Sequence, residues 1–93
     1  MNLQLLVVED DHSQRELICQ LLSTEGYLLH QADSVESAML TLKAEPAIAL
    51  VLCDWKLGTG NGMQVLQYVR QHNAAAGFVV ATAYGSVSHA VEA

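Results

Sequence analysis

Basic residues are scarce in this sequence: Lys and Arg together number 4, against 10 Asp and Glu, which gives a formal net charge of −6. A surface with this excess of acid repels phosphate backbones, so we expect no direct nucleic acid binding by this chain. Long apolar runs are also missing. The longest, residues 47–53, has the length of a strand, whereas a membrane span needs roughly 20 residues. A membrane partner is therefore not expected.

Cysteine is also rare, with only Cys19 and Cys53 present, and neither has the spacing of a metal site. Both are interpreted as buried thiols of a reducing compartment, where disulfides are uncommon. The opening residues Met1 to Gln4 carry no basic residue and do not resemble a signal peptide. These features predict a cytoplasmic protein. The 93 residues leave room for one domain, residues 1–93.

Apolar residues follow two alternating spacings along the chain. Short apolar runs predict strands at residues 3–8, 27–30, 47–53 and 78–81. Helical spacing after each run predicts four helices: one with Leu17, Ile18, Leu21 and Leu22 that stops at Gly26; one capped by Ser34 and stopped by Pro46; one from Met63 to about His72; and one opened by Gly85 or Ser86, with Val87, Ala90 and Val91. Four β-α units predict an α/β fold, a doubly wound parallel sheet with helices on both faces.

Acidic residues lie at the carboxyl ends of two predicted strands. Glu9, Asp10 and Asp11 follow the first strand, and Asp54 follows the third. These ends are neighbours in a doubly wound sheet, whose ligands bind at that edge. Packed carboxylates repel one another unless a cation lies among them, so the pattern predicts a Mg²⁺ site. The alternative is that the acids at 9–11 only cap the helix that follows.

A hydroxyl belongs to the same edge, because Thr82 follows the fourth predicted strand directly. A hydroxyl beside carboxylates and Mg²⁺ suits recognition of a phosphoryl oxygen, and a carboxylate can accept a phosphoryl group. Three segments together resemble the response-regulator receiver domains of two-component signalling: LVVEDD at 6–11 with Arg15, LCDWKL at 52–57 with Gly62, and VATA at 80–83. The resemblance covers essentially the whole chain.

The resemblance implies a flavodoxin-like receiver fold with strand order 2-1-3-4. It implies that Asp54 is the phosphoacceptor, taking a phosphoryl group from the phosphohistidine of a sensor histidine kinase. Mg²⁺ would be held by Glu9, Asp10, one oxygen of Asp54 and the backbone carbonyl of Lys56. Thr82 matches the switch hydroxyl, while Asp11 and Tyr84 are candidate modulators, Asp11 more as a helix cap than as a ligand. The partners implied are the kinase and an output domain or downstream protein.

Two departures from the family qualify this interpretation. Gly58 stands where receivers usually have proline, and residues 58–62 are interpreted as a turn, since no Gly-Lys-Ser/Thr follows to make a phosphate-binding loop. No lysine follows Lys56, so the fifth strand, its lysine and the fifth helix are expected to be missing. We therefore expect impaired phosphorylation and an open edge at the fourth strand. Copies of the chain would self-associate through this edge or through the surface that the missing helix would cover.

Two other functions compete with a phosphoacceptor signalling module. A Mg²⁺-dependent phosphohydrolase would use Asp54 as its nucleophile, but it would need a second aspartate two residues later, where this sequence has Lys56. A receiver-like module that acts by protein contact alone, without phosphorylation, is the other alternative. The first prediction is thus a signalling domain and not a turnover enzyme.

Overall fold

The computed structural model describes residues 3–58, 60–81 and 87–89. Its main sheet has four parallel strands in the order β2-β1-β3-β6, and a fifth, β7, is antiparallel to β6. The strands are β1 (Gln4–Val8), β2 (Leu28–Ala32), β3 (Leu50–Asp54), β6 (Gly77–Ala81) and β7 (Val87–His89). The predicted α/β class and the predicted parallel order 2-1-3-4 are both confirmed, with β6 as the fourth parallel strand.

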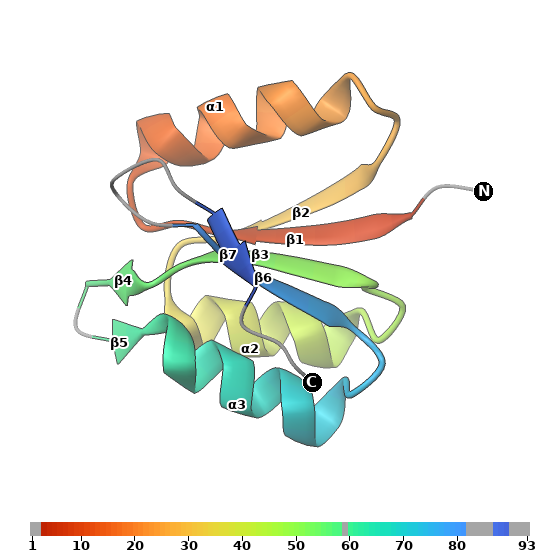
Figure 1. Ribbon diagram of the computed structural model, residues 1–93, viewed down its shortest axis with the longest axis vertical. Coiled ribbons are helices and arrows are strands. Elements are labelled where there is room, and N and C mark those ends of the chain that lie inside the picture. The colour runs from red at the N-terminus through yellow and green to blue at the C-terminus, as the bar shows by residue number, and fades with distance from the viewer. Residues whose placement is uncertain (1–2, 59, 82–86, 90–93) are drawn as a thin grey trace.

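Helices cover both faces of the sheet, α1 (His12–Ser23) on one side and α2 (Val35–Ala44) with α3 (Gly62–His72) on the other (Figure 1). Ser34 caps α2 as predicted: its side chain accepts a hydrogen bond from the Ser37 amide, and the Ser34 amide donates one to Oγ of Ser37. Asn61 caps α3 in the same way. α1 ends at Ser23, three residues before Gly26, where φ is +82°.

The core lies on the side of α2 and α3. Alternate strand residues point to opposite faces, and those on this side, such as Leu6, Val51 and Val80, are buried together with Leu42 and Val65 of the two helices. On the other side, Leu5 and Val7 of β1 are buried, but Leu50, Leu52 and Val79 are only half-buried. α1 has no buried residue, and its Leu17 and Leu21 are 53% and 64% exposed. The α1 layer is therefore much more loosely packed than the layer beneath α2 and α3.

The fourth predicted helix is wrong where the structure describes it. Residues 87–89 form strand β7, which pairs with β6 in antiparallel register, Val79 with His89 and Ala81 with Val87. The expected open edge of the fourth strand is wrong for its last three residues, 79–81, because they pair with β7. The unpaired backbone groups of an edge strand are satisfied by a neighbouring strand. Hydrogen bonding to β6 therefore outweighs the weak helical pattern of Val87, Ala90 and Val91. Self-association of the chain stays a prediction.

The loop after β3 contains a small hairpin. Strands β4 (Lys56–Leu57) and β5 (Gly60–Asn61) pair in antiparallel register, Leu57 with Gly60. Gly58 begins the connection with φ of +62°, a value that favours glycine. The predicted turn at residues 58–62 is thus a short hairpin leading into α3. Among the described residues, no helix is both long and apolar enough to cross a membrane.

Candidate functional site

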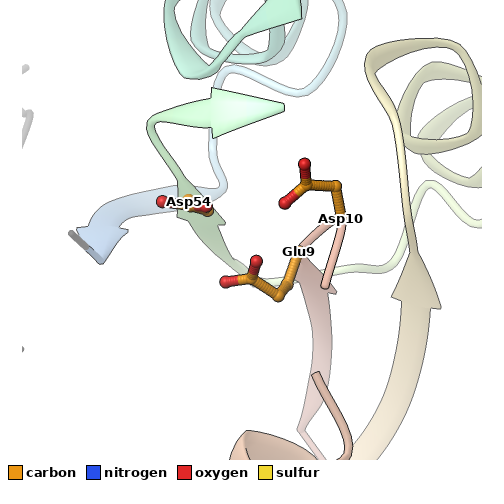
Figure 2. Close-up of side chains that lie close together, drawn as sticks. All are labelled: Glu9, Asp10 and Asp54. Carbon is orange, nitrogen blue, oxygen red and sulfur yellow. The ribbon is translucent and has the colours of Figure 1, made fainter. Parts of the chain in front are cut away.

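Three carboxylates meet at the carboxyl edge of the sheet. Glu9 and Asp10 follow β1, Asp54 ends β3, and these two parallel strands are neighbours with Val8 opposite Cys53. One carboxylate oxygen from each of the three acids lies within 4.8 Å of the other two. Figure 2 shows the three carboxyl groups turned toward a common space. The structure therefore brings together the three side chains that the sequence predicted as metal ligands.

Glu9 is the buried member of this cluster, with only 8% of its surface exposed. Burial raises the pKa of Glu9 from 4.5 to about 7, and the charges of Asp54 and Asp10 add to the increase. The backbone amide of Asp11 donates a hydrogen bond to Oε2 at 3.1 Å and opposes part of that rise. A carboxyl group with this pKa is near half-protonated at neutral pH, so it holds a proton that a cation can displace.

Asp10 is exposed, and its carboxylate is hydrogen-bonded to the loop that follows β3. Its Oδ2 accepts a hydrogen bond from the backbone amide of Gly58, at 3.1 Å. Asp11 occupies the N-cap position of α1, but its side chain makes no capping hydrogen bond. The alternative that these acids serve only as a helix cap is not supported, because Glu9 and Asp10 lie close to Asp54. The expected capping role of Asp11 is not supported either, since its backbone carbonyl only accepts the first hydrogen bond of the helix, from the Arg15 amide.

Arg15 ties the β1–α1 loop to β2. Its guanidinium donates to the backbone carbonyl of Glu9 at 2.8 Å and to Oε1 of Gln31 at 3.1 Å. The sequence singled out Arg15 only as part of a motif and gave it no role. Its position five residues after Asp10, one turn into α1, was the available signal, because that spacing points the side chain back toward the helix start.

The phosphoacceptor candidate Asp54 is half-buried and lies beside tightly packed backbone. The Gly62 amide donates to the carbonyl of Trp55 at 2.7 Å. A Cβ at Gly62 would lie 2.9 Å from Cε3 of Trp55 and 3.1 Å from the carbonyl oxygen of Asp54. The absence of a side chain at Gly62 therefore lets the start of α3 approach the backbone of residues 54–55 closely. This contact holds the backbone that carries Asp54. Lys56 follows on the exposed start of β4.

Two other predictions concern residues outside the described part of the chain, Thr82 and Tyr84. Their roles stay predictions. Cys53, adjacent to Asp54, is fully buried, and burial raises the pKa of its thiol to about 12, with the charges of Asp54 and Glu9 adding to the shift. A thiol in this state is not a nucleophile at neutral pH, as the sequence interpretation held.

The donor set fits Mg²⁺. This ion takes oxygen ligands, one or two of them carboxylates, and keeps several waters. The cluster offers one buried carboxylate, one half-buried and one exposed, so water has access to one side. Glu9 and Asp10 each have a backbone amide holding one oxygen, which leaves the other free for an ion. Three negative charges at this spacing are stable together only with a proton or a cation among them.

Comparison with known proteins decides the family. Residues 5–93 match the response regulator receiver domain family. The chain is a response regulator receiver domain. Its fold agrees: a response regulator receiver protein from Pseudomonas putida superimposes with a TM-score of 0.81 at 26% identity, over 88% of this chain and 69% of that one. A response regulator protein from Burkholderia pseudomallei has the same fold, with a TM-score of 0.83 at 24% identity.

Relatives of this receiver domain include much longer proteins. Transcriptional regulatory protein ZraR from Escherichia coli is 36% identical over 92 residues, which make up 99% of this chain and 21% of ZraR. Response regulator protein FleR from Pseudomonas aeruginosa is 36% identical over 93 residues, 100% of this chain and 20% of FleR. The receiver domain thus spans about a fifth of these relatives. It belongs to two-component signalling as a signalling module and not as a turnover enzyme.

Proposed function

We propose that this receiver domain accepts a phosphoryl group on Asp54 from the phosphohistidine of a sensor histidine kinase, in a Mg²⁺-dependent step. The observation that carries the proposal is the meeting of Glu9, Asp10 and Asp54 within 4.8 Å at the carboxyl edge of the sheet. Family membership supports the kinase as the donor and the cytoplasm as the location. The output is a domain or downstream protein that senses the phosphorylated state.

The chemistry assigned to Asp54 is a nucleophilic displacement at phosphorus. A carboxylate oxygen of Asp54 forms the new P–O bond, the P–N bond to the histidine breaks, and its electron pair stays on the imidazole nitrogen. The half-buried position of Asp54 at the end of a rigid strand holds this oxygen in place. The attacking group in this step is a carboxylate oxygen, which needs no separate general base.

The remaining residues of the site prepare it for the phosphoryl group. Mg²⁺ bound by Glu9, Asp10, Asp54 and the backbone carbonyl of Lys56 would offset the charge on the phosphoryl oxygens. Glu9 would release its proton on binding the ion, and Arg15 and the Asp11 amide hold its backbone and carboxylate in position. We assign the switch hydroxyl to Thr82 and a modulating role to Tyr84, both by their match to the family motif.

The proposal is tested by intact-mass spectrometry after incubation with acetyl phosphate and Mg²⁺. We expect the gain of one phosphoryl group, and we expect it to be lost in Asp54→Asn and in the presence of EDTA. Asp33→Asn is the matched control, because Asp33 lies after β2 at the same edge of the sheet but outside the carboxylate cluster. Loss of the phosphoryl group in both variants, or in neither, would contradict the assignment to Asp54. No gain in the native chain would favour a module that acts by contact alone.

A further inference from the structure

The β4–β5 hairpin and the metal site are joined by one backbone hydrogen bond. The amide nitrogen of Gly58 donates to Oδ2 of Asp10 at 3.1 Å, across 48 positions of sequence. Receivers usually carry proline at this position, and proline has no N–H to donate. The contact therefore depends on the residue by which this chain departs from its family.

The hairpin holds this amide in a defined place. Leu57 pairs with Gly60, so two residues connect the strands, and a positive φ at the first of them is what short hairpin connections favour. Gly58 meets that demand with φ of +62°. At the other end, β5 packs closely on α2: a Cβ at Gly60 would lie 2.6 Å from Cγ2 of Val35. The donor is thus fixed by the fold and not by a flexible side chain.

A fixed donor on one oxygen restricts rotation of the Asp10 carboxylate. Asp10 is exposed, so without this bond its carboxyl group would sample several orientations in water. With Oδ2 held by Gly58, the carboxylate keeps one of its oxygens within 4.8 Å of a carboxylate oxygen of Glu9 and of Asp54. Figure 2 shows the Asp10 carboxyl group turned toward the space between these two acids.

We propose that Gly58 is a positioning residue of the metal site, its amide orienting Asp10 for Mg²⁺. The inference rests on the proposed function in that it takes the three acids as ligands of this ion. Partners that orient metal ligands are typically worth 10- to 100-fold in metal affinity. For one exposed ligand held by one hydrogen bond, we expect an effect of about tenfold on the dissociation constant of Mg²⁺.

The test removes the N–H while keeping the positive φ. The full chain is assembled by chemical ligation of residues 1–52 with 53–93 at Cys53, with glycine, D-alanine or D-proline at position 58. D residues adopt positive φ as L residues adopt negative φ, so Gly58→D-Ala keeps both the turn and the donor. Gly58→D-Pro keeps the turn and loses the donor. The probe is Mg²⁺ alone, followed by calorimetry, with thermal unfolding measured by circular dichroism as the control for folding.

We expect the D-proline variant to bind Mg²⁺ about tenfold more weakly than the D-alanine variant, with the latter within twofold of the native chain. A second readout is the amide proton shift of Gly58 in metal-free protein, which should move upfield in Asp10→Ala. Equal affinities in the two D variants would overturn the inference, whether both match the native chain or both are weakened. Native protein that binds Mg²⁺ but takes no phosphoryl group contradicts the proposed function alone, and native protein that binds no Mg²⁺ overturns both.

Discussion

Protonation of Glu9 is expected to set the pH range in which the site binds Mg²⁺. Burial, with the charges of Asp54 and Asp10, raises the pKa of Glu9 from 4.5 to about 7. A ligating carboxylate must lose its proton, so the metal and the proton compete for it. For one competing proton with this pKa, the apparent affinity for Mg²⁺ falls about twofold at pH 7 and about tenfold at pH 6, and it is almost unchanged at pH 8.

Calorimetric titration with Mg²⁺ between pH 6 and 8 measures this dependence directly. In buffers of different ionisation enthalpy, the same titration gives the number of protons released, which we expect to be about one half per ion at pH 7. Glu9→Gln is the control, because it keeps the size of the side chain and removes the titrating proton. Its affinity should be weaker and nearly independent of pH. A native dissociation constant that stays within twofold across this range would refute the reasoning.

The same pKa has a consequence for the stability of the metal-free domain. Between pH 4.5 and about 7 the native state binds more protons at Glu9 than the unfolded state does. The contribution of Glu9 to the free energy of unfolding is therefore full below pH 4.5 and is lost as the pH rises toward 7. In urea unfolding, the free energy of unfolding should decrease less between pH 5 and pH 7.5 for Glu9→Gln than for the native chain. Mg²⁺ should restore the free energy of unfolding of the native chain at the higher pH.

Three other predictions follow from local packing. Gly62→Ala should lower the free energy of unfolding by about 1–3 kcal/mol in urea titrations, because its Cβ meets the backbone of residue 54 at 3.1 Å. Gly77→Ala should change the free energy of unfolding by less than about 1 kcal/mol, because its Cβ meets only a flexible leucine methyl. Equal effects of the two substitutions would contradict the argument. Ser34→Ala should cost about 1 kcal/mol by the same measurement, through loss of the α2 cap, and an unchanged midpoint would count against that cap. Iodoacetamide should modify half-buried Cys19 well before buried Cys53, as peptide mapping would show, and the reverse order would contradict the assigned burial.

Much of this fold was predictable because the strands are short apolar runs and the helix starts carry their own signals. Ser34 is an example, since its side chain marks the start of α2 through a contact only three residues along the chain. Residues 87–89 are the opposite case, where the edge of β6 determines the structure and local spacing misled the prediction. A pattern of apolar residues reports periodicity, but it does not report which backbone groups lack a partner.

The acidic site was predictable for a similar reason. Parallel neighbouring strands bring their carboxyl ends together, so Glu9, Asp10 and Asp54 had to converge once the strand order was known. The contacts that hold these ligands were not predictable. Every residue type except proline has a backbone N–H, so nothing in the sequence marks Gly58 as a donor. Only the hairpin geometry brings its amide to Asp10.

The loose packing of α1 bears on how the molecule opens. Local unfolding begins where few apolar side chains are buried, and α1 buries none completely. Arg15 of this helix donates to the backbone carbonyl of Glu9, so each opening of α1 removes one of the hydrogen bonds that position this ligand candidate. Hydrogen exchange should therefore show the amides of α1 among the least protected in the helices. The lifetime of the assembled site is then governed by the weakest layer of the fold, while the α2 and α3 layer keeps the sheet intact beneath it.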